Sequence, residues 1–323
     1  MDRETLDRLI EESTGLNGHE SMNGYDHEEE EERQALTDEA DHEILMHRDV
    51  HFGGDFAVML RYYEEDGLGV NPSFDIERIH YLAAVEKELG GNLAALMLTS
   101  SEAERVAQAR AAYSKLKEIY QRKSSPIERL VADLLLCEED DPQELIAEIL
   151  EKGVEIVPSL LEIVQTADLY DALAPGYGLA PALAAHCLGD LQVEKAIIPL
   201  FEILGRETEF DEEVILDALG HIGTPARDFL IKRLKGRPIT ADTLYAAFAL
   251  SGFPQDQVIA TAAYEELLDP EVQRKPLLAT YLVCHCDALQ KTAHREHFVA
   301  MAKDLALPKT LRVEIENIVR NWK

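Results

Sequence analysis

The stretch 180–222, APALAAHCLGDLQVEKAIIPLFEILGRETEFDEEVILDALGHI, decides the fold of this chain because it contains one phrase twice. Leu188 and Leu219 are 31 residues apart, and each is followed by a glycine and then, two residues later, by a branched aliphatic residue. A third copy of the phrase reaches Leu250 after another 31 residues, with Ser251 in the glycine position. A repeat period of about 20 to 50 residues is typical of proteins built from stacked structural repeats. The sequence therefore predicts a stacked architecture.

The residues around each copy predict pairs of helices. The stretches 196–204 and 226–234 both read Ala-x-x-x-Leu-x-x-x-Leu, and apolar residues four apart form one buried stripe on a helix. Gly189 and Gly220 are predicted to end the first helix of each pair, at a position that favours a positive φ. Pro225 is predicted to open the next helix, where its missing N–H group costs nothing. The joins are only a few residues long, so neighbouring helices are expected to be antiparallel. The expected pairs are 180–191 with 194–204, 211–222 with 225–234, and 240–251 with 255–268.

The repeated phrases resemble HEAT repeats, especially the short form found in bacterial HEAT-like proteins. The stretches 180–205 and 211–235 match that form well, 240–268 matches less well, and 126–166 and 271–323 match only as helix pairs. The resemblance implies an all-α fold in which HEAT-like helix pairs form a right-handed α-solenoid. HEAT arrays commonly bind partners along a concave face.

The organisation of the chain suggests three parts. Residues 1–34 are expected to be an acidic, disordered and mobile tail, because residues 1–51 hold 17 Asp and Glu against 4 Lys and Arg. Residues 35–123 are expected to form a small helical N-terminal subdomain that does not match the repeat. The sequence KSSP at 123–126 marks a boundary, and residues 124–323 are expected to form the HEAT-like repeats.

The charge of the chain restricts its partners. It carries 62 Asp and Glu against 31 Lys and Arg, a formal net charge of −31. Nucleic-acid binding requires basic residues that neutralise phosphates, and anionic membrane surfaces would repel this chain. We therefore expect neither nucleic acid nor membrane as a partner, and a protein partner of basic or mixed charge.

The cysteines and the apolar runs favour a cytoplasmic location. The chain has only 4 cysteines, all within apolar helical phrases, which is typical of a reducing compartment. The start of the sequence, MDRETLDRLIEES, lacks the apolar segment of a secretory signal. The longest apolar run, Leu277–Cys286, is about half the length that a membrane span needs.

One cluster of histidines is a candidate metal site. His47 and His51 are four residues apart, so on a helix both face the same way, which suits a divalent metal ion. His42 and Asp55 could add to this site, although residues five apart are splayed by about 140° around a helix. The other interpretation is a polar helix end with ordinary histidines.

Aromatic residues gather in one segment of a chain in which Phe, Trp and Tyr make up only 7%. This concentration fits either a small core for the N-terminal helices or an exposed partner-binding site, since aromatic residues are enriched at interface centres. The candidate partner-binding residues are Phe52, Phe56, Tyr62, Tyr63 and Phe74.

No catalytic motif was found. The chain has no phosphate-binding loop, no dinucleotide fingerprint and no nucleophile elbow, and we expect no cofactor. The function that the sequence favours is a non-catalytic protein–protein interaction or scaffold module that binds its partner through the solenoid face. The alternative is a metal-binding protein or metal-dependent enzyme with its site around His42, His47 and His51.

Overall fold

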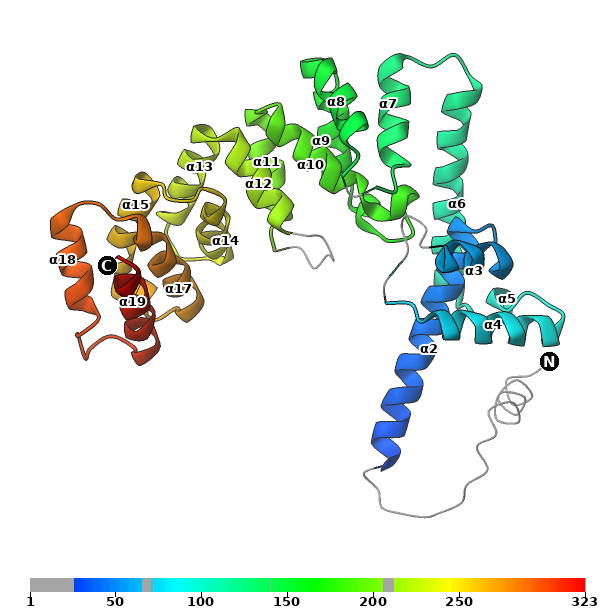
Figure 1. Cartoon of the computed structure of the whole chain (residues 1–323), viewed down its shortest axis with the longest axis horizontal. Coiled ribbons are helices and arrows are strands. Elements are labelled where there is room, and N and C mark those ends of the chain that lie inside the picture. The colour runs from blue at the N-terminus through cyan, green and yellow to red at the C-terminus, as the bar shows by residue number, and fades with distance from the viewer. Residues whose placement is uncertain (1–25, 66–70, 72, 140, 206–211, 323) are drawn as a thin grey trace. The chain divides into compact units, whose positions relative to one another are not determined.

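The computed structural model describes residues 26–65, 71, 73–139, 141–205 and 212–322, and this part of the chain is all-α (Figure 1). It contains 16 helices of seven or more residues, and no strand occurs among the described residues. The predicted all-helical class is therefore confirmed. None of the described helices is both long enough and apolar enough to cross a lipid bilayer.

The chain divides into two compact units. Unit 1 comprises Met1–Leu60 with Pro72–Ser100, and unit 2 comprises Arg61–Asn71 with Ser101–Lys323. The repeats were expected to start at residue 124. Unit 2 therefore contains this expected region together with residues that precede it in the sequence. Most of the predicted tail, residues 1–25, lies outside the described residues, whereas residues 26–34 belong to the first described helix.

Unit 1 is a small helical assembly. Its helices are α2 (Asp26–His51), α3 (Phe56–Glu64), which continues into unit 2, α4 (Ile76–Leu89) and the short α5 (Ala94–Met97). The side chain of Asp75 caps α4 by accepting a hydrogen bond from the Glu77 backbone N–H at 3.0 Å. Aliphatic side chains that are 2% exposed or less form the core of the unit: Ile44, Leu45, Met59, Ile79, Leu82 and Leu93.

Unit 2 contains the remaining helices, which follow one another along the chain (Figure 1). One of them, α7 (Pro126–Leu135), begins with a complete capping box formed by Ser125 and Glu128. The helices are α6 (Ser100–Gln121), α7 (Pro126–Leu135), α8 (Gln143–Lys152), α9 (Val157–Gln165), α10 (Ala180–Asp190), α11 (Ile197–Ile203), α12 (Glu212–Ile222), α13 (Thr224–Leu234), α14 (Ala241–Ala249), α15 (Gln257–Leu267), α16 (Pro270–Gln273), α17 (Pro276–His285), α18 (Thr292–Met301) and α19 (Lys309–Asn321).

Consecutive helix pairs of unit 2 pack against one another. The first helices of the pairs make a series of contacts, α10 with α12, α12 with α14, α14 with α17, and α17 with α19. Their apolar side chains join one continuous core that runs from Leu130 to Ile315. The apolar faces of these helices are thus buried against one another.

The predicted role of Gly189 and Gly220 was wrong. Both glycines lie inside α10 and α12, and neither has a positive φ. The left-handed residues of these pairs come later, in the turns before the second helices: Gln192 (φ 53°), Gly223 (φ 80°) and Gln255 (φ 59°).

The glycines instead allow the helices to approach closely. A Cβ atom on Gly189 would lie 2.7 Å from the Cα atom of Ala218 in the next pair. A Cβ atom on Gly220 would lie 2.5 Å from the carbonyl oxygen of Gly252, again in the next pair. The repeated Leu-Gly phrase is therefore a packing signal between pairs rather than a helix-ending signal.

Candidate functional site

The candidate metal-binding histidines lie on α2 of unit 1. The His47 side chain is only 2% exposed, and its ring centroid is 4.6 Å from that of His51. The rings of Phe52 and Phe74 pack on His47 at 5.6 and 5.2 Å. Burial, and secondarily the nearby His51, lower the pKa of His47 to about 3. The imidazole of His47 is therefore neutral at physiological pH.

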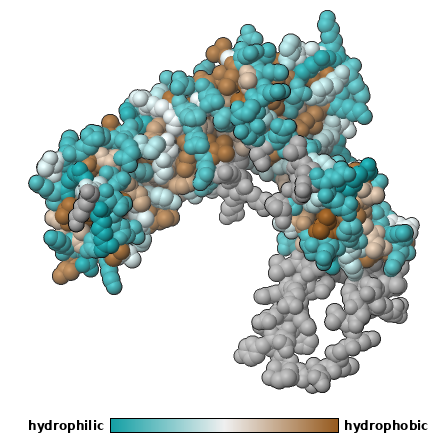
Figure 2. Space-filling model, viewed as in Figure 1, coloured by the Kyte–Doolittle hydropathy of each residue, from teal (hydrophilic) through white to brown (hydrophobic). Residues whose placement is uncertain are grey.

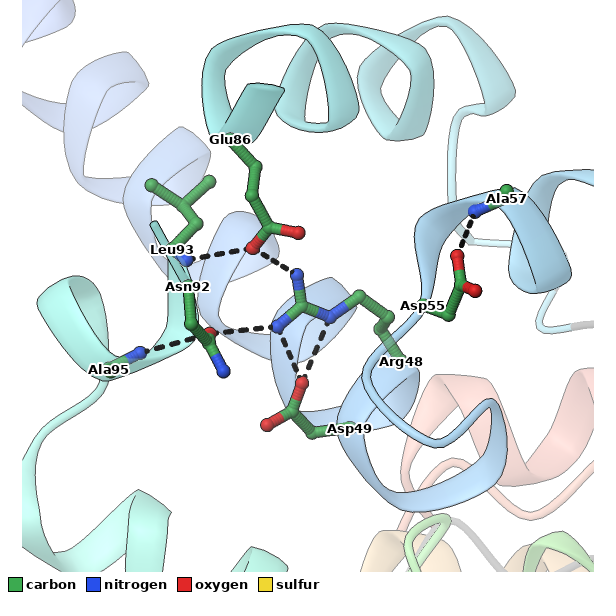
Figure 3. Close-up of polar contacts among 8 residues, drawn as sticks. All are labelled: Arg48, Asp49, Asp55, Ala57, Glu86, Asn92, Leu93 and Ala95. Atoms are coloured by element: carbon green, nitrogen blue, oxygen red, sulfur yellow. Dashed lines mark hydrogen bonds and ion pairs between the residues drawn. The ribbon is translucent and has the colours of Figure 1, made fainter. Parts of the chain in front are cut away.

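The other two candidates of this site are placed less favourably. Asp55 is exposed and accepts a hydrogen bond from the Ala57 backbone N–H at 2.8 Å, which caps the start of α3 (Figure 3). His42 is half-buried one turn or more before His47 on the same helix. Among the described residues, no group of three or more His, Cys, Asp or Glu side chains is arranged to hold a metal ion. Of the predicted set, His47 and His51 have their rings in contact.

Most of the candidate aromatic residues are packed inside the protein. Phe52, Phe56 and Tyr63 are 6 to 7% exposed, and Phe74 and Tyr62 are half-buried. The Tyr62 hydroxyl donates a hydrogen bond to Glu138 at 2.7 Å, and burial together with this bond raises the pKa of Tyr62 to about 12. Three of the five rings are thus buried, whereas Tyr62 and Phe74 keep part of their surface exposed.

A buried arginine on α2 is the feature of unit 1 that sequence reasoning missed. Arg48 is 0% exposed, and its guanidinium contacts three polar side chains (Figure 3). Its Nε and Nη2 atoms donate to Asp49 Oδ1 at 2.9 and 2.5 Å. Its Nη1 donates to Glu86 Oε2 at 2.6 Å, and Nη2 also donates to Asn92 Oδ1 at 3.2 Å.

This arginine connects the elements of unit 1. Glu86 accepts a second hydrogen bond from the Leu93 backbone N–H at 2.7 Å, so α4 and the segment before α5 are held to the same guanidinium. The ring of Phe56 covers the guanidinium at 4.5 Å from its centroid. A guanidinium has five N–H donors, and here it makes four hydrogen bonds to two carboxylates and an amide of the same unit. Arg48 therefore has a structural role, because its charge is balanced inside the protein.

In unit 2 the most regular polar feature is a series of bridges between consecutive helix pairs. Each bridge joins side chains, or a side chain and a carbonyl oxygen, that are 29 to 32 residues apart. The bridges are Gln192 to the His221 carbonyl (3.2 Å), Arg227 to Asp256 (3.2 Å), Lys235 to Glu265 (2.9 Å), Arg237 to Glu266 (2.7 Å) and Gln255 to Asp287 (3.3 Å). The spacing of these contacts matches the period of the sequence repeat.

Two histidines flank one aspartate at the junction of α10 and α12. The His221 Nδ1 atom is 2.8 Å from Asp190 Oδ1, and the His186 Nε2 atom is 3.4 Å from Asp190 Oδ2. The three side chains are between 29 and 56% exposed, so water screens the interactions between them. The group forms part of the contact between the two helices.

A hollow with basic walls lies beside the end of α13 and the start of α14. Its volume is about 490 Å³. It is lined by Phe229, Lys232, Arg233, Gly236, Arg237, Pro238, Thr240, Asp242 and Thr243. The hollow could not be predicted from the sequence, but five basic residues within 227–240 are a local signal for it.

Exposed apolar residues are dispersed. Figure 2 shows hydrophilic and hydrophobic residues interspersed over the visible face of the described residues. The most exposed large apolar side chains, Val154 and Leu305, are 85 and 83% exposed and belong to different parts of unit 2. Scattered apolar residues of this kind are ordinary on a protein surface.

Comparison of the chain with protein-family models, with curated proteins and with solved structures finds no match to any of them. The resemblance to HEAT repeats therefore depends on the repeated phrases alone. What the structure adds is an all-helical protein of many packed helices.

Proposed function

We propose that the protein is a non-catalytic protein–protein interaction module, in which the helix pairs of unit 2 form a HEAT-like right-handed solenoid that binds its partner. The observation that carries the proposal is the series of bridges between pairs, 29 to 32 residues apart. Repeats that contact only their neighbours build an extended surface, and such surfaces are used for binding other proteins.

The charge of the chain supports a basic or mixed-charge partner. A formal net charge of −31 attracts cationic surfaces and accelerates their association, an effect that falls as the salt concentration rises. The proposal includes a cytoplasmic location, which the small number of cysteines supports.

Capture of partners by the tagged full-length protein, followed by lysine cross-linking and mass spectrometry, tests this proposal. Lys195 and Lys303 belong to unit 2, whereas Lys87 lies on α4 of unit 1. We expect a partner in stoichiometric amount, released by raised salt, with cross-links to the lysines of unit 2. Cross-links confined to Lys87, or no stoichiometric partner at physiological salt, would contradict the proposal.

The metal-binding alternative keeps one supporting observation. His47 and His51 have ring centroids 4.6 Å apart, and burial keeps His47 in the neutral form that ligates metals. Elemental analysis of protein purified without chelators tests it, with His51→Ala as the variant. A stoichiometric transition metal in the wild type that is lost from the variant would favour the alternative over the scaffold.

A further inference from the structure

We infer that the partner is of mixed charge and that the hollow beside α13 and α14 binds the carboxylate side chains of one acidic segment of it. The inference rests on the proposed function and assigns part of its binding surface. The hollow has a volume of about 490 Å³, which lies within the usual range of about 300–1,000 Å³ for ligand sites. Such a volume accepts one or a few side chains rather than a folded domain.

The sequence stretch beside the hollow is richer in basic residues than the chain as a whole, and one acidic residue, Asp242, also lines the hollow. The stretch 227–240 contains five Lys and Arg residues and one acidic residue, whereas the whole chain has twice as many acidic as basic residues. At physiological salt, charges are screened beyond about 8 Å. A ligand in the hollow therefore responds to the charged residues that line it, Lys232, Arg233, Arg237 and Asp242, more than to the net charge of the chain.

Three of the five basic residues are used inside unit 2. Arg227 pairs with Asp256, Lys235 with Glu265, and Arg237 with Glu266 of the next helix pair. Their charges are therefore largely balanced by the contacts that join consecutive pairs. Two basic residues, Lys232 and Arg233, remain for a ligand.

Arg233 is held at the wall of the hollow by an aromatic ring. Its guanidinium lies 5.2 Å from the centroid of Phe229, and that ring is fixed in turn by an edge contact with Phe201 at 5.5 Å. Its nearest carboxylate, on Asp242, is at 3.7 Å, and both side chains are about half exposed. So exposed and so long an ion pair contributes little, and a better-placed carboxylate would displace it. A guanidinium stacked on a ring keeps its hydrogen-bond donors at the edge, where they can bind a carboxylate with two bonds.

Lys232 adds a second cation at the same wall. It is exposed, and it forms no ion pair with any residue in the described part of the chain. Phe229 and Pro238 supply apolar surface to the same hollow, which suits the methylene groups of a glutamate side chain. Cations at the wall and apolar surface beside them fit an acidic side chain better than an inorganic anion.

Fluorescence anisotropy with a labelled oligoglutamate peptide tests the inference. A peptide of about ten residues spans about 33 Å when extended, enough to cross the hollow in any direction. We expect the full-length protein to bind it with an affinity that falls as salt rises, and Lys232→Glu/Arg233→Glu to bind it about tenfold more weakly or worse. The matched control is Lys303→Glu/Lys309→Glu, which makes the same change in net charge at two other exposed lysines of unit 2. Equal binding by the two double variants would overturn the inference.

A milder variant and a second measurement guard against misfolding and self-association. Lys232→Gln/Arg233→Gln removes the two charges without adding repulsion and is expected to bind with intermediate affinity. Binding by this variant that equals the wild type would also overturn the inference. Concentration-dependent self-association that Lys232→Glu/Arg233→Glu abolishes would make a second copy of this chain the occupant and would contradict a separate partner. The proposed function fails separately, if the wild-type protein captures no partner at all.

Discussion

Replacing Gly189 by alanine sets two effects of opposite sign against each other. Alanine is the better helix former by up to about 1 kcal/mol, so an isolated α10 would gain stability. In unit 2, however, the new Cβ atom would lie 2.7 Å from the Cα atom of Ala218 and 3.2 Å from its Cβ atom and carbonyl oxygen. Carbon atoms in ordinary contact are about 3.5–4.0 Å apart, so α10 and α12 would have to separate by roughly 1 Å.

The neighbouring atom decides which effect is larger. A backbone Cα atom cannot turn aside as the end of a flexible side chain can, so the shift must involve the whole helix. Overpacking of this kind costs about 1–3 kcal/mol, which exceeds the gain in helix propensity. We therefore expect Gly189→Ala to destabilise unit 2 by about 1–2 kcal/mol, and Gly189→Val by more.

The assay uses the only tryptophan of the chain. Trp322 packs against Phe298 with ring centroids 5.5 Å apart, so its fluorescence reports the unfolding of unit 2 in urea. The control is Gly91→Ala, where a Cβ atom would meet nothing within 4 Å. Because Gly91 belongs to unit 1 and Trp322 to unit 2, the stability of the control is measured by hydrogen exchange of unit 1 peptides. We expect the control to change stability by less than about 0.5 kcal/mol. A Gly189→Ala protein as stable as the wild type, or more stable, would refute the argument that close approach explains the glycine.

Three further predictions concern single side chains. Arg48→Met should destabilise unit 1 by about 3–5 kcal/mol because it leaves the buried Asp49 and the half-buried Glu86 without their cation. Arg122→Met, at an exposed ion pair, should cost about 0–1 kcal/mol. Hydrogen exchange of unit 1 and unit 2 peptides measures both effects, and equal effects would contradict the structural role of Arg48. The pKa of His47 is about 3 in the folded protein against an ordinary 6.5. Between pH 6.5 and about pH 3 the unfolded chain therefore binds one more proton at His47 than the folded protein does. The free energy of unfolding should decrease as the pH is lowered through this range, by at most about 1.4 kcal/mol per pH unit. A His47→Gln protein that keeps the full slope would exclude His47 as the cause. Iodoacetamide should label the exposed Cys284 in the native protein. Cys286 is buried and its thiol has a raised pKa, so it should be labelled only after unfolding. Equal labelling of the two cysteines in the native protein, measured by mass spectrometry, would contradict the burial of Cys286.

The helices of the repeat region could be predicted because their signals are local. The expected helix at 180–191 is observed as α10 at Ala180–Asp190, and the one at 225–234 as α13 at Thr224–Leu234. Apolar residues at helical spacing and a proline at the helix start lie within one turn or two of each other. No knowledge of distant residues is needed to identify such helices.

The sites could not be predicted because their signals are not local. Arg48 hydrogen-bonds to Glu86 and Asn92, which are 38 and 44 residues away, and an arginine by itself predicts a surface position. The role of Gly189 depends on Ala218 in the next helix pair, so sequence reasoning assigned it to a positive φ instead. The aromatic residues show the same limit, since a local concentration of rings fits a core and an interface equally well.

We propose that the partner binds the surface of unit 2 rather than the histidines of unit 1. The most direct measurement is quantitative capture of the partner by two full-length variants, Lys232→Glu/Arg233→Glu and His42→Ala/His51→Ala. We expect the first variant to lose most of the partner and the second to retain it at the wild-type level. Loss of the partner from the histidine variant, with wild-type retention by the charge-reversed variant, would contradict the account.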